Sequence, residues 1–426
     1  MPNINEMPVH ELLPLLQARQ LTARDLAEAC IERITAREDK VGAWVQFCPD
    51  TVRKTADKLD SGPVRGLLHG IPVAVKDIID TCDYPTERGS PIYPGRRPER
   101  DAACVAAVRR MGALVTGKTV TTEFAYFKPG KTANPKALNH TPGGSSSGSA
   151  AAVADCMVPI GFGSQTAASL TRPAAYCGIT GYKASWGQHA LDGIQGLAPS
   201  LDSLGILSRS AEDAEIMRAA LLDEPYKPLE PENHRLKVGY CQTPDWASAD
   251  ATVASAMEAA RSSLEQAGAV VSPLLLPEIF TNLSDLHKLI MAYEARRMLE
   301  REYLENRELM SPQLYDLLDS GDRISTSDYQ LAVATTHRAK TEIATILSDL
   351  DVVMAPSAPG EAPAGLGATG DPVFSRMWTL LQLPSVALPV MTGPNGLPLG
   401  IQFIGKLGQD RKLLETARFF ERQTQA

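Results

Sequence analysis

Two loops rich in small residues carry hydroxyl groups that could act as nucleophiles. The loop at 143–149 holds four serines among three glycines, and glycine allows backbone conformations that expose such hydroxyls. The loop at 163–173 places Ser169 directly after Ala167 and Ala168. Backbone N–H groups in a turn of small residues can converge on a developing negative charge. The residue types and their spacing suit covalent catalysis by a serine, although composition alone fits a flexible surface loop at 143–149 as well.

A serine nucleophile needs a base, and Lys76 is the candidate. It directly follows the run 71–75, whose five apolar residues predict a strand that is covered on both faces. Burial disfavours the charged form of a lysine and moves its pKa toward neutrality, where the amine can accept a proton. The alternative, a lysine on the surface, fits poorly with so apolar a strand.

A rival interpretation takes Ser146 as the nucleophile of an esterase. Residues 144–148 match G-x-S-x-G, the nucleophile elbow of α/β-hydrolases. That elbow needs a strand immediately before the serine, whereas residues 136–142 are not strand-like. A triad histidine should follow downstream in a suitable turn, but His287 and His337 both lie in helical patterns. The context argues against the esterase.

The elements that must position these residues alternate between helices and strands. A capping box formed by Thr22 and Asp25 predicts a first helix of about 15 residues, and Asp101 can cap a helix that runs to about Met111. Further helices are predicted at 150–154, 251–267 and over much of 284–348. Strands are predicted at 71–75, 112–117, 158–160, 237–240, 269–271, 351–354 and 399–404. This alternation is typical of an α/β protein with parallel strands.

The composition is that of a globular protein. Of the 426 residues, 44% are hydrophobic and 22% are charged, which excludes a disordered or fibrous chain. A formal net charge of -8 gives no basic field that would attract nucleic acid. The start of the chain lacks the basic and apolar pattern of a signal peptide, and no stretch of about 18 apolar residues could cross a bilayer. We therefore expect a cytoplasmic protein that binds neither nucleic acid nor a membrane.

Neither a metal nor a cofactor is expected. The seven cysteines are widely spaced and form no CxxC pair, which indicates neither a disulfide framework nor a zinc site. The sequence contains no repeat and no low-complexity linker. A single domain over residues 1–426 is the simplest interpretation.

Three blocks of sequence together resemble the signature of the amidase signature family. They lie at 69–77, 143–150 and 163–173, and both their order and their spacing fit. Further pieces agree, so the resemblance spans nearly the whole chain; they lie at 112–125, 383–385 and 396–402. The resemblance implies an α/β fold in which helices cover both faces of a central mixed, largely parallel β-sheet. It places the catalytic core at about 60–215 and a helical substrate-pocket region at about 284–348.

The resemblance also implies a Ser-cisSer-Lys triad. Ser169 would be the nucleophile, Ser145 the bridging serine after a cis peptide bond at Gly144, and Lys76 the base. An amide or ureide bond would be cleaved through an acyl-enzyme. The oxyanion would be held by the backbone N–H groups of four residues, which are Thr166, Ala167, Ala168 and Ser169.

Two features near the nucleophile bear on the substrate. The family usually has two glycines where this chain has Ala167 and Ala168, and the extra methyl groups could crowd the acyl site or strain a turn that needs a positive φ. Arg172 follows Ser169 by three residues, as in malonamidase-like and ureide-cleaving members, in which such an arginine binds a substrate carboxylate. The resemblance thus implies a small, carboxylate-bearing substrate. The alternative is an arginine that fixes the loop structurally.

Two other functions stay open. One is the amidase subunit of a tRNA-dependent amidotransferase, which would work with partner subunits. The other is a catalytically inactive relative that acts as a binding module, which the presence of Lys76, Ser145 and Ser169 disfavours. The sequence leaves the oligomeric state open, a homodimer included. It does not define the acyl group, because the pocket walls are expected to come largely from the helical region.

Overall fold

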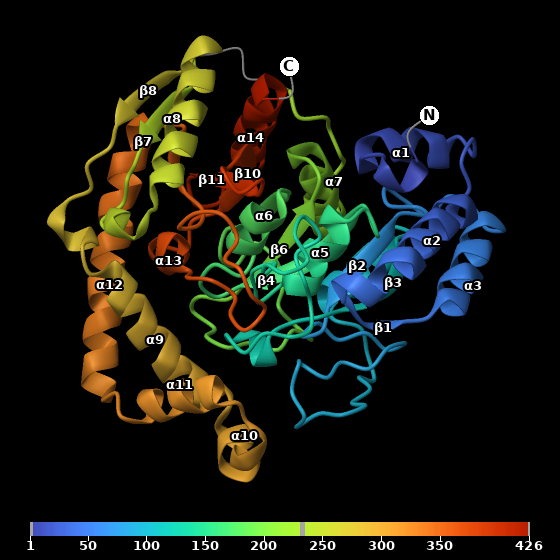
Figure 1. Ribbon diagram of the computed structural model, residues 1–426, viewed down its shortest axis with the longest axis horizontal. Helices are drawn as coiled ribbons and strands as arrows, with labels where there is room; N and C mark the ends of the chain where they lie inside the picture. Colours follow the sequence, from blue (N-terminus) through green and yellow to red (C-terminus); the bar gives the residue numbers. More distant parts are fainter. Residues whose placement is uncertain (1–2, 231–234, 425–426) are drawn as a thin grey trace.

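The fold is built on one continuous sheet. The computed structural model describes residues 3–230 and 235–424 (Figure 1). From one edge to the other, its 11 strands are β1 (Trp44–Phe47), β3 (Leu114–Thr119), β2 (Pro72–Lys76), β4 (Ile160–Gln165), β6 (Ser203–Ser208), β5 (Thr180–Lys183), β10 (Ser385–Thr392), β11 (Pro398–Ile404), β9 (Val352–Pro356), β7 (Lys237–Tyr240) and β8 (Val270–Pro273).

Helices surround this sheet. In chain order they are α1 (Val9–Gln17), α2 (Ala23–Val41), α3 (Pro49–Asp60), α4 (Ala103–Arg110), α5 (Ser147–Ala154), α6 (Thr171–Cys177), α7 (Ala211–Leu222), α8 (Ala251–Gln266), α9 (Leu283–Met298), α10 (Glu300–Glu305), α11 (Pro312–Asp322), α12 (Thr326–Ile346), α13 (Val373–Leu380) and α14 (Asp410–Thr424). Strands from both halves of the chain share the one sheet, and a single domain stays our interpretation.

The sheet is mixed, as predicted, but it is not largely parallel. Among the described residues, six of the ten pairings between neighbouring strands are antiparallel. The expectation of mostly parallel strands is therefore wrong. Parallel neighbours need a long crossover connection, whereas a short loop allows only an antiparallel pair. Residues 393–397 are such a loop, and they join β10 directly to β11.

Both faces of the sheet are covered, as predicted. Successive side chains of a strand point to opposite faces. In β2, Val73 and Val75 pack in a core cluster that includes residues of α7 and α14. Ala74 lies between them and packs instead in a second cluster with Ala150 of α5 and Ala174 of α6. Alanine on α5 and α6 lets these two helices approach the sheet closely.

Some predicted elements have different boundaries in the structure. Thr22 and Asp25 form the predicted capping box, but α1 precedes the helix that they begin. Asp101 does not cap α4, since its carboxylate accepts a hydrogen bond from the N–H of Cys82 and pairs with Arg109. The strand predicted at 158–160 instead runs from Ile160 to Gln165, because that whole stretch pairs with β6. The expected loop at 163–173 therefore begins inside a strand.

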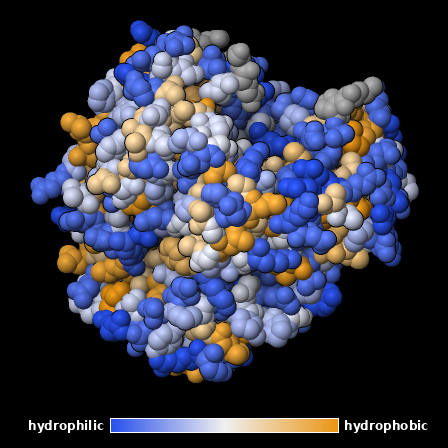
Figure 2. All heavy atoms as spheres, in the orientation of Figure 1, coloured by the Kyte–Doolittle hydropathy of each residue, from blue (hydrophilic) through white to orange (hydrophobic). Residues whose placement is uncertain are grey.

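The stretch predicted to be helical at 284–348 forms α9 to α12, which enter the chain between β8 and β9. Figure 1 shows these helices gathered at one side of the molecule, with α1 to α3 at the other. Hydrophilic residues cover much of the face in Figure 2, and hydrophobic residues lie in smaller groups among them. Within the described ranges, no helix is long and apolar enough to cross a membrane.

Candidate active site

The sheet brings the end of β2 next to β4. These strands are parallel neighbours, and Val75 is paired with Phe162. The carboxyl ends of parallel neighbours meet at the same edge of a sheet, so Lys76 and Ser164 lie close together there. The Nζ of Lys76 is 2.8 Å from the Oγ of Ser164. The strand pairing therefore fixes one side of the lysine environment.

The same amine reaches the first serine loop. The Nζ of Lys76 lies 2.6 Å from the Oγ of Ser145. The lysine side chain is fully buried, and this desolvation lowers its pKa to about 7, although the negative charge of Asp202 acts in the opposite direction. Desolvation wins because a charged ammonium in a buried site loses its hydration. A substantial fraction of Lys76 is therefore neutral at neutral pH.

The loop that carries Ser145 is held by close backbone approaches. The peptide bond between Gly144 and Ser145 is cis, at the position that the resemblance implies. Gly143 has a φ of +80°, and a Cβ there would lie 2.8 Å from the Cα of Pro173, so a larger residue does not fit. The N–H of Thr122 donates a 3.3 Å hydrogen bond to the carbonyl oxygen of Ser145. The loop is thus packed between two neighbouring segments.

Ser169 lies in the turn between β4 and α6. The side chain of Gln165 fixes this turn, because its Oε1 accepts hydrogen bonds from the N–H groups of Leu170 and Thr171 at 2.9 and 3.1 Å. The N–H of Ser146 donates a 3.4 Å hydrogen bond to the carbonyl oxygen of Ser169 and so joins the two serine loops. Ser145 and Ser169 line the same small pocket.

Two carbonyl groups in this turn point away from that pocket. The Nε2 of His287 on α9 is 2.8 Å from the carbonyl oxygen of Thr166, and burial lowers the pKa of His287 to about 3. The ring is therefore neutral, and Nε2 donates. The Oγ1 of Thr379 on α13 donates a 2.8 Å hydrogen bond to the carbonyl oxygen of Ala167.

A carbonyl and the N–H of the next residue point in opposite directions across a trans peptide unit. Holding the carbonyls of Thr166 and Ala167 therefore orients the N–H groups of Ala167 and Ala168. Within the described part of the chain, neither N–H donates a hydrogen bond to the protein. Both alanines line the pocket beside Ser169. Their N–H groups can accordingly serve a ligand.

The two alanines fit the turn without backbone strain. Neither Ala167 nor Ala168 has a positive φ, so this backbone does not need the glycines that the family usually has. Their methyl groups instead help to make the pocket small, with a volume of about 20 Å³. Such a volume admits one group of about the size of a water molecule.

Arg172 is part of the structure around the cis peptide bond. Its guanidinium donates hydrogen bonds of 2.6 Å to the carbonyl oxygens of Gly370 and Gly144 and one of 3.1 Å to the Oγ1 of Thr369. The side chain is only 3% exposed, and burial lowers its pKa to about 10. These contacts match the alternative in which Arg172 fixes the loop.

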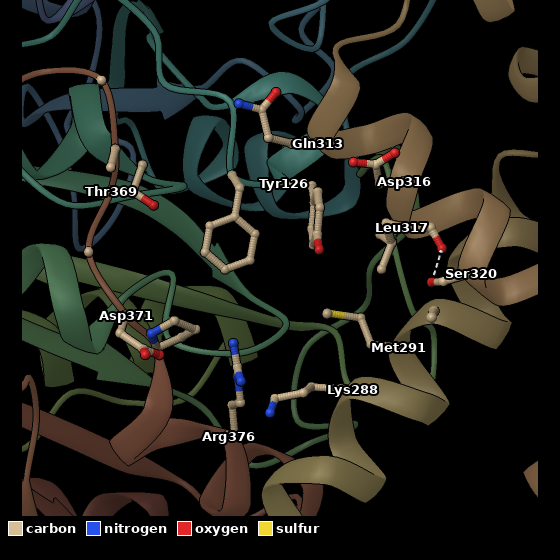
Figure 3. Close-up of a pocket in the computed structure, with 16 residues that line it drawn as sticks. Tyr126, Lys288, Met291, Gln313, Asp316, Leu317, Ser320, Thr369, Asp371 and Arg376 are labelled. Carbon is tan, nitrogen blue, oxygen red and sulfur yellow. Dashed lines mark hydrogen bonds between the residues drawn. The ribbon is translucent and has the colours of Figure 1, made fainter. Parts of the chain in front are cut away.

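A larger open pocket of about 730 Å³ adjoins the small one. The two pockets have five wall residues in common, which are Tyr126, Phe127, Met291, Thr369 and Pro372. α9 and α11 supply one side of the outer wall, and the loop at 367–372 with Arg376 at the start of α13 supplies the other (Figure 3). Residues of the helical region at 284–348 thus line this pocket, together with the loop at 367–372, which lies outside that region.

The geometry does not support the esterase interpretation. Residues 139–146 form no strand that could lead directly into Ser146. The Oγ of Ser146 donates a 3.3 Å hydrogen bond to the carbonyl oxygen of Ser164 and therefore points toward β4. Of the two histidines considered, His287 binds a backbone carbonyl, and His337 is exposed on α12.

Sequence reasoning missed several residues that support the site. Ser164 lies within one of the signature blocks, but nothing in the sequence distinguishes it from the other serines there. His287 and Thr379 come from distant helices and act on backbone groups, which no side-chain pattern reveals. Asp202 accepts a 2.5 Å hydrogen bond from the Oγ1 of Thr166, and burial raises the pKa of Asp202 to about 6. Only the folded chain brings these groups together.

Comparison with known proteins is consistent with this geometry. A sequence profile of the family described as Amidase matches residues 25–414. A glutamyl-tRNA(Gln) amidotransferase subunit of Anaeromyxobacter dehalogenans (strain 2CP-C) is 30% identical over 465 residues, which cover 95% of this chain and 94% of that protein. The crystal structure of an amidase is 29% identical, with a TM-score of 0.90 over 98% of this chain and 100% of the other.

The native peptide amidase from Stenotrophomonas maltophilia is also similar. It is 28% identical, with a TM-score of 0.84 over 99% of this chain and 97% of the other. The profile match covers most of the chain, and the structural similarity covers 98% of it. The chain therefore belongs to the amidase family, whose signature it carries, and is a hydrolase that acts on amide C–N bonds.

Proposed function

We propose that this amidase hydrolyses a small, carboxylate-bearing amide or ureide through Ser169, Ser145 and Lys76. The observation that carries the proposal is the distance of 2.6 Å between the Nζ of Lys76 and the Oγ of Ser145. The burial that lowers the pKa of Lys76 to about 7 supports a role as base. Ser169 shares the pocket of Ser145 and is the candidate nucleophile.

The reaction begins with the transfer of two protons. Neutral Lys76 accepts the proton of Ser145, while Ser145 accepts that of Ser169. A neutral amine has one lone pair and two N–H bonds. If one N–H bond is donated to Ser164, which lies 2.8 Å away, the lone pair can face Ser145. The Oγ of Ser169 then attacks the substrate carbonyl, the proton passes to the leaving amine, and water hydrolyses the acyl-enzyme.

The oxyanion of the tetrahedral intermediate is held by backbone N–H groups of the turn before Ser169. We assign this role to Thr166, Ala167, Ala168 and Ser169. The orientation of the Ala167 and Ala168 groups by His287 and Thr379 supports it. Each essential donor of this kind contributes about 3 to 4 kcal/mol to catalysis.

Arg172 positions the serine loop in this proposal. Its hydrogen bonds connect the carbonyl oxygen of Gly144 to Thr369 and Gly370. Both terminal nitrogens of the guanidinium are already engaged, so a two-pronged contact with a substrate carboxylate would have to replace existing bonds. Arg172 therefore has a structural role in this proposal, and a different residue would bind the substrate carboxylate.

The decisive experiment is to locate the acyl group. An amide is mixed with the enzyme, the reaction is quenched during turnover, and the modified peptide is identified by mass spectrometry. The adduct is expected on Ser169. Ser169→Ala should abolish both adduct and turnover, whereas Ser146→Ala, the matched control, should fold and retain activity. An adduct on Ser146 would refute the assignment.

A second candidate function is that of a component of an amidotransferase complex. The observation that favours it is the 30% identity to the glutamyl-tRNA(Gln) amidotransferase subunit over 95% of this chain. A protein of that kind would need partner subunits for its full reaction. Ammonia release by the purified chain from small amides, at a rate that partner proteins do not raise, would favour the free-standing enzyme. Stable copurification with partner subunits would favour the amidotransferase.

A further inference from the structure

The outer pocket contains a partly buried cation to which the described residues make no hydrogen bond. Arg376 lies on α13 and lines this pocket. Its Nε is buried and has no hydrogen-bond partner among the described residues. Burial lowers the pKa of Arg376, yet an arginine side chain stays charged in proteins. A charged guanidinium with a buried, unpartnered Nε is less favourable than one that binds an anion.

The acidic residues that act on Arg376 are engaged elsewhere. Asp371, Asp245 and Asp285 favour its charged form electrostatically. The carboxylate of Asp371 accepts a hydrogen bond from the N–H of Val373, that of Asp245 accepts one from the Oγ of Ser284, and that of Asp285 pairs with Lys288 at 2.8 Å. Among the described residues, none of these three carboxylates forms a hydrogen bond or ion pair with Arg376, so its guanidinium can still bind an anion from outside.

A second cation lies near Arg376, although its charge is paired with Asp285. Lys288 lies on α9 and lines the same pocket. Figure 3 shows the side chains of Arg376 and Lys288 extending from α13 and α9 toward the same part of the pocket. The pair of Lys288 with Asp285 is exposed and therefore weak, so the ammonium can turn toward an anion that binds at Arg376.

The pocket also connects this cation to the proposed nucleophile. The outer and inner pockets have Tyr126, Phe127 and Met291 in their common wall. These side chains offer apolar surface to a hydrocarbon chain. A substrate whose amide lies at Ser169 can thus extend along them into the outer pocket. The inner pocket is too small, at about 20 Å³, for a carboxylate and its chain to fit beside Ser169.

We propose that Arg376 is the residue that binds a substrate carboxylate, with Lys288 as a second cation nearby. The substrate is then an amide with a carboxylate several bonds from the scissile carbonyl, separated from it by an apolar chain. The inference rests on the proposed function, because it takes Ser169 as the reacting end. The carboxylate lies either on the acyl side or on the amine side of the amide bond.

Two matched pairs of substrates distinguish these sides. Adipamate and hexanamide differ by a carboxylate on the acyl side, and N-acetyl-β-alanine and N-propylacetamide differ by one on the amine side. In the wild type, kcat/KM should be about 10- to 150-fold higher for the acid than for the neutral partner in one pair. Arg376→Gln should reduce that ratio to near one, and Arg376→Lys should recover only part of it.

The control is Arg301→Gln, which removes the same charge from the surface of α10, where Arg301 pairs with Glu305. It should leave the ratio unchanged. Thermal unfolding of each variant checks that the fold is intact, and Arg376→Lys serves if Arg376→Gln does not fold. A wild-type ratio near one in both pairs, or a ratio that Arg376→Gln leaves intact, would overturn the proposal.

A binding measurement separates this inference from the proposed function. Calorimetry with Ser169→Ala measures the affinity for the preferred acid without turnover, and the double variant with Arg376→Gln should bind it about 10- to 150-fold more weakly. If the wild type hydrolyses none of the four amides, adipamate and N-acetyl-β-alanine are both used as binding probes. Binding that depends on Arg376 would then support the carboxylate site while the proposed function fails. Turnover combined with binding that does not depend on Arg376 would refute the carboxylate site and leave the proposed function intact.

Discussion

The Nζ of Lys76 lies 2.6 Å from the Oγ of Ser145 in a fully buried site. Because burial lowers the pKa of Lys76 to about 7, the amine is protonated below this pH and cannot accept a proton. We therefore expect kcat/KM to rise about tenfold per pH unit below pH 7 and to level off above it. Measurements from pH 5 to 9 test this, and a flat profile would contradict it. Lys76→Met should lose about 100- to 10,000-fold of the wild-type rate above pH 7 and should lack the rise below it.

Ser164 should affect the same pH profile. Its Oγ lies 2.8 Å from the Nζ of Lys76 and stabilises the protonated amine by accepting a hydrogen bond. In Ser164→Ala, the apparent pKa of kcat/KM should therefore move to lower pH, and the maximum rate should fall about tenfold because the lysine is less well oriented. A variant that loses activity without any change in this pKa would assign Ser164 a purely structural role.

His287 should act through the backbone of the turn. Removing its contact with the carbonyl oxygen of Thr166 leaves the N–H of Ala167 less well oriented toward the oxyanion. We expect His287→Ala to lower kcat about 10- to 100-fold, somewhat less than the loss of an oxyanion donor, with little change in KM. His337→Ala, on the exposed face of α12, is the matched control. Equal loss in both variants would exclude a specific role for His287.

Arg172 and Arg376 should respond differently to substrate charge. Since Arg172 holds the carbonyl oxygens of Gly144 and Gly370, Arg172→Gln should lower kcat/KM equally for an acid and its neutral partner. Arg172→Lys should recover little, because an ammonium cannot bond three separate acceptors in this geometry. A loss confined to acids would instead return the carboxylate-binding role to Arg172.

Much of the central site could be predicted because its residues occupy motifs. The apolar run before Lys76 predicts a buried strand, and the structure places that lysine in a buried position at the end of β2. The Gly and Ser composition at 143–149 marks a loop of special conformation, which contains the cis peptide bond. These features are local in sequence, so local patterns identify them.

The residues that surround this central site could not be predicted from the sequence, and the reason is physical. Arg376 and His287 lie on helices whose sequence patterns show only which face is buried. Whether such a residue faces a pocket depends on how its helix packs against the sheet. The same holds for strand direction, since the antiparallel pairing of β4 with β6 depends on contacts between segments far apart in the chain. Tertiary packing decides both.

The position of α9 to α12 between β8 and β9 has a consequence for how such an enzyme can diversify. The segment leaves the sheet at its edge strand and returns two strands away, about 10 Å across the strands. β8 and β9 are both parallel to β7, so it also crosses from one end of the strands to the other. It can therefore be exchanged as a module while Lys76, Ser145 and Ser169 stay untouched. A grafted segment would bring a new outer pocket wall, but it would also have to supply a donor at the position of His287.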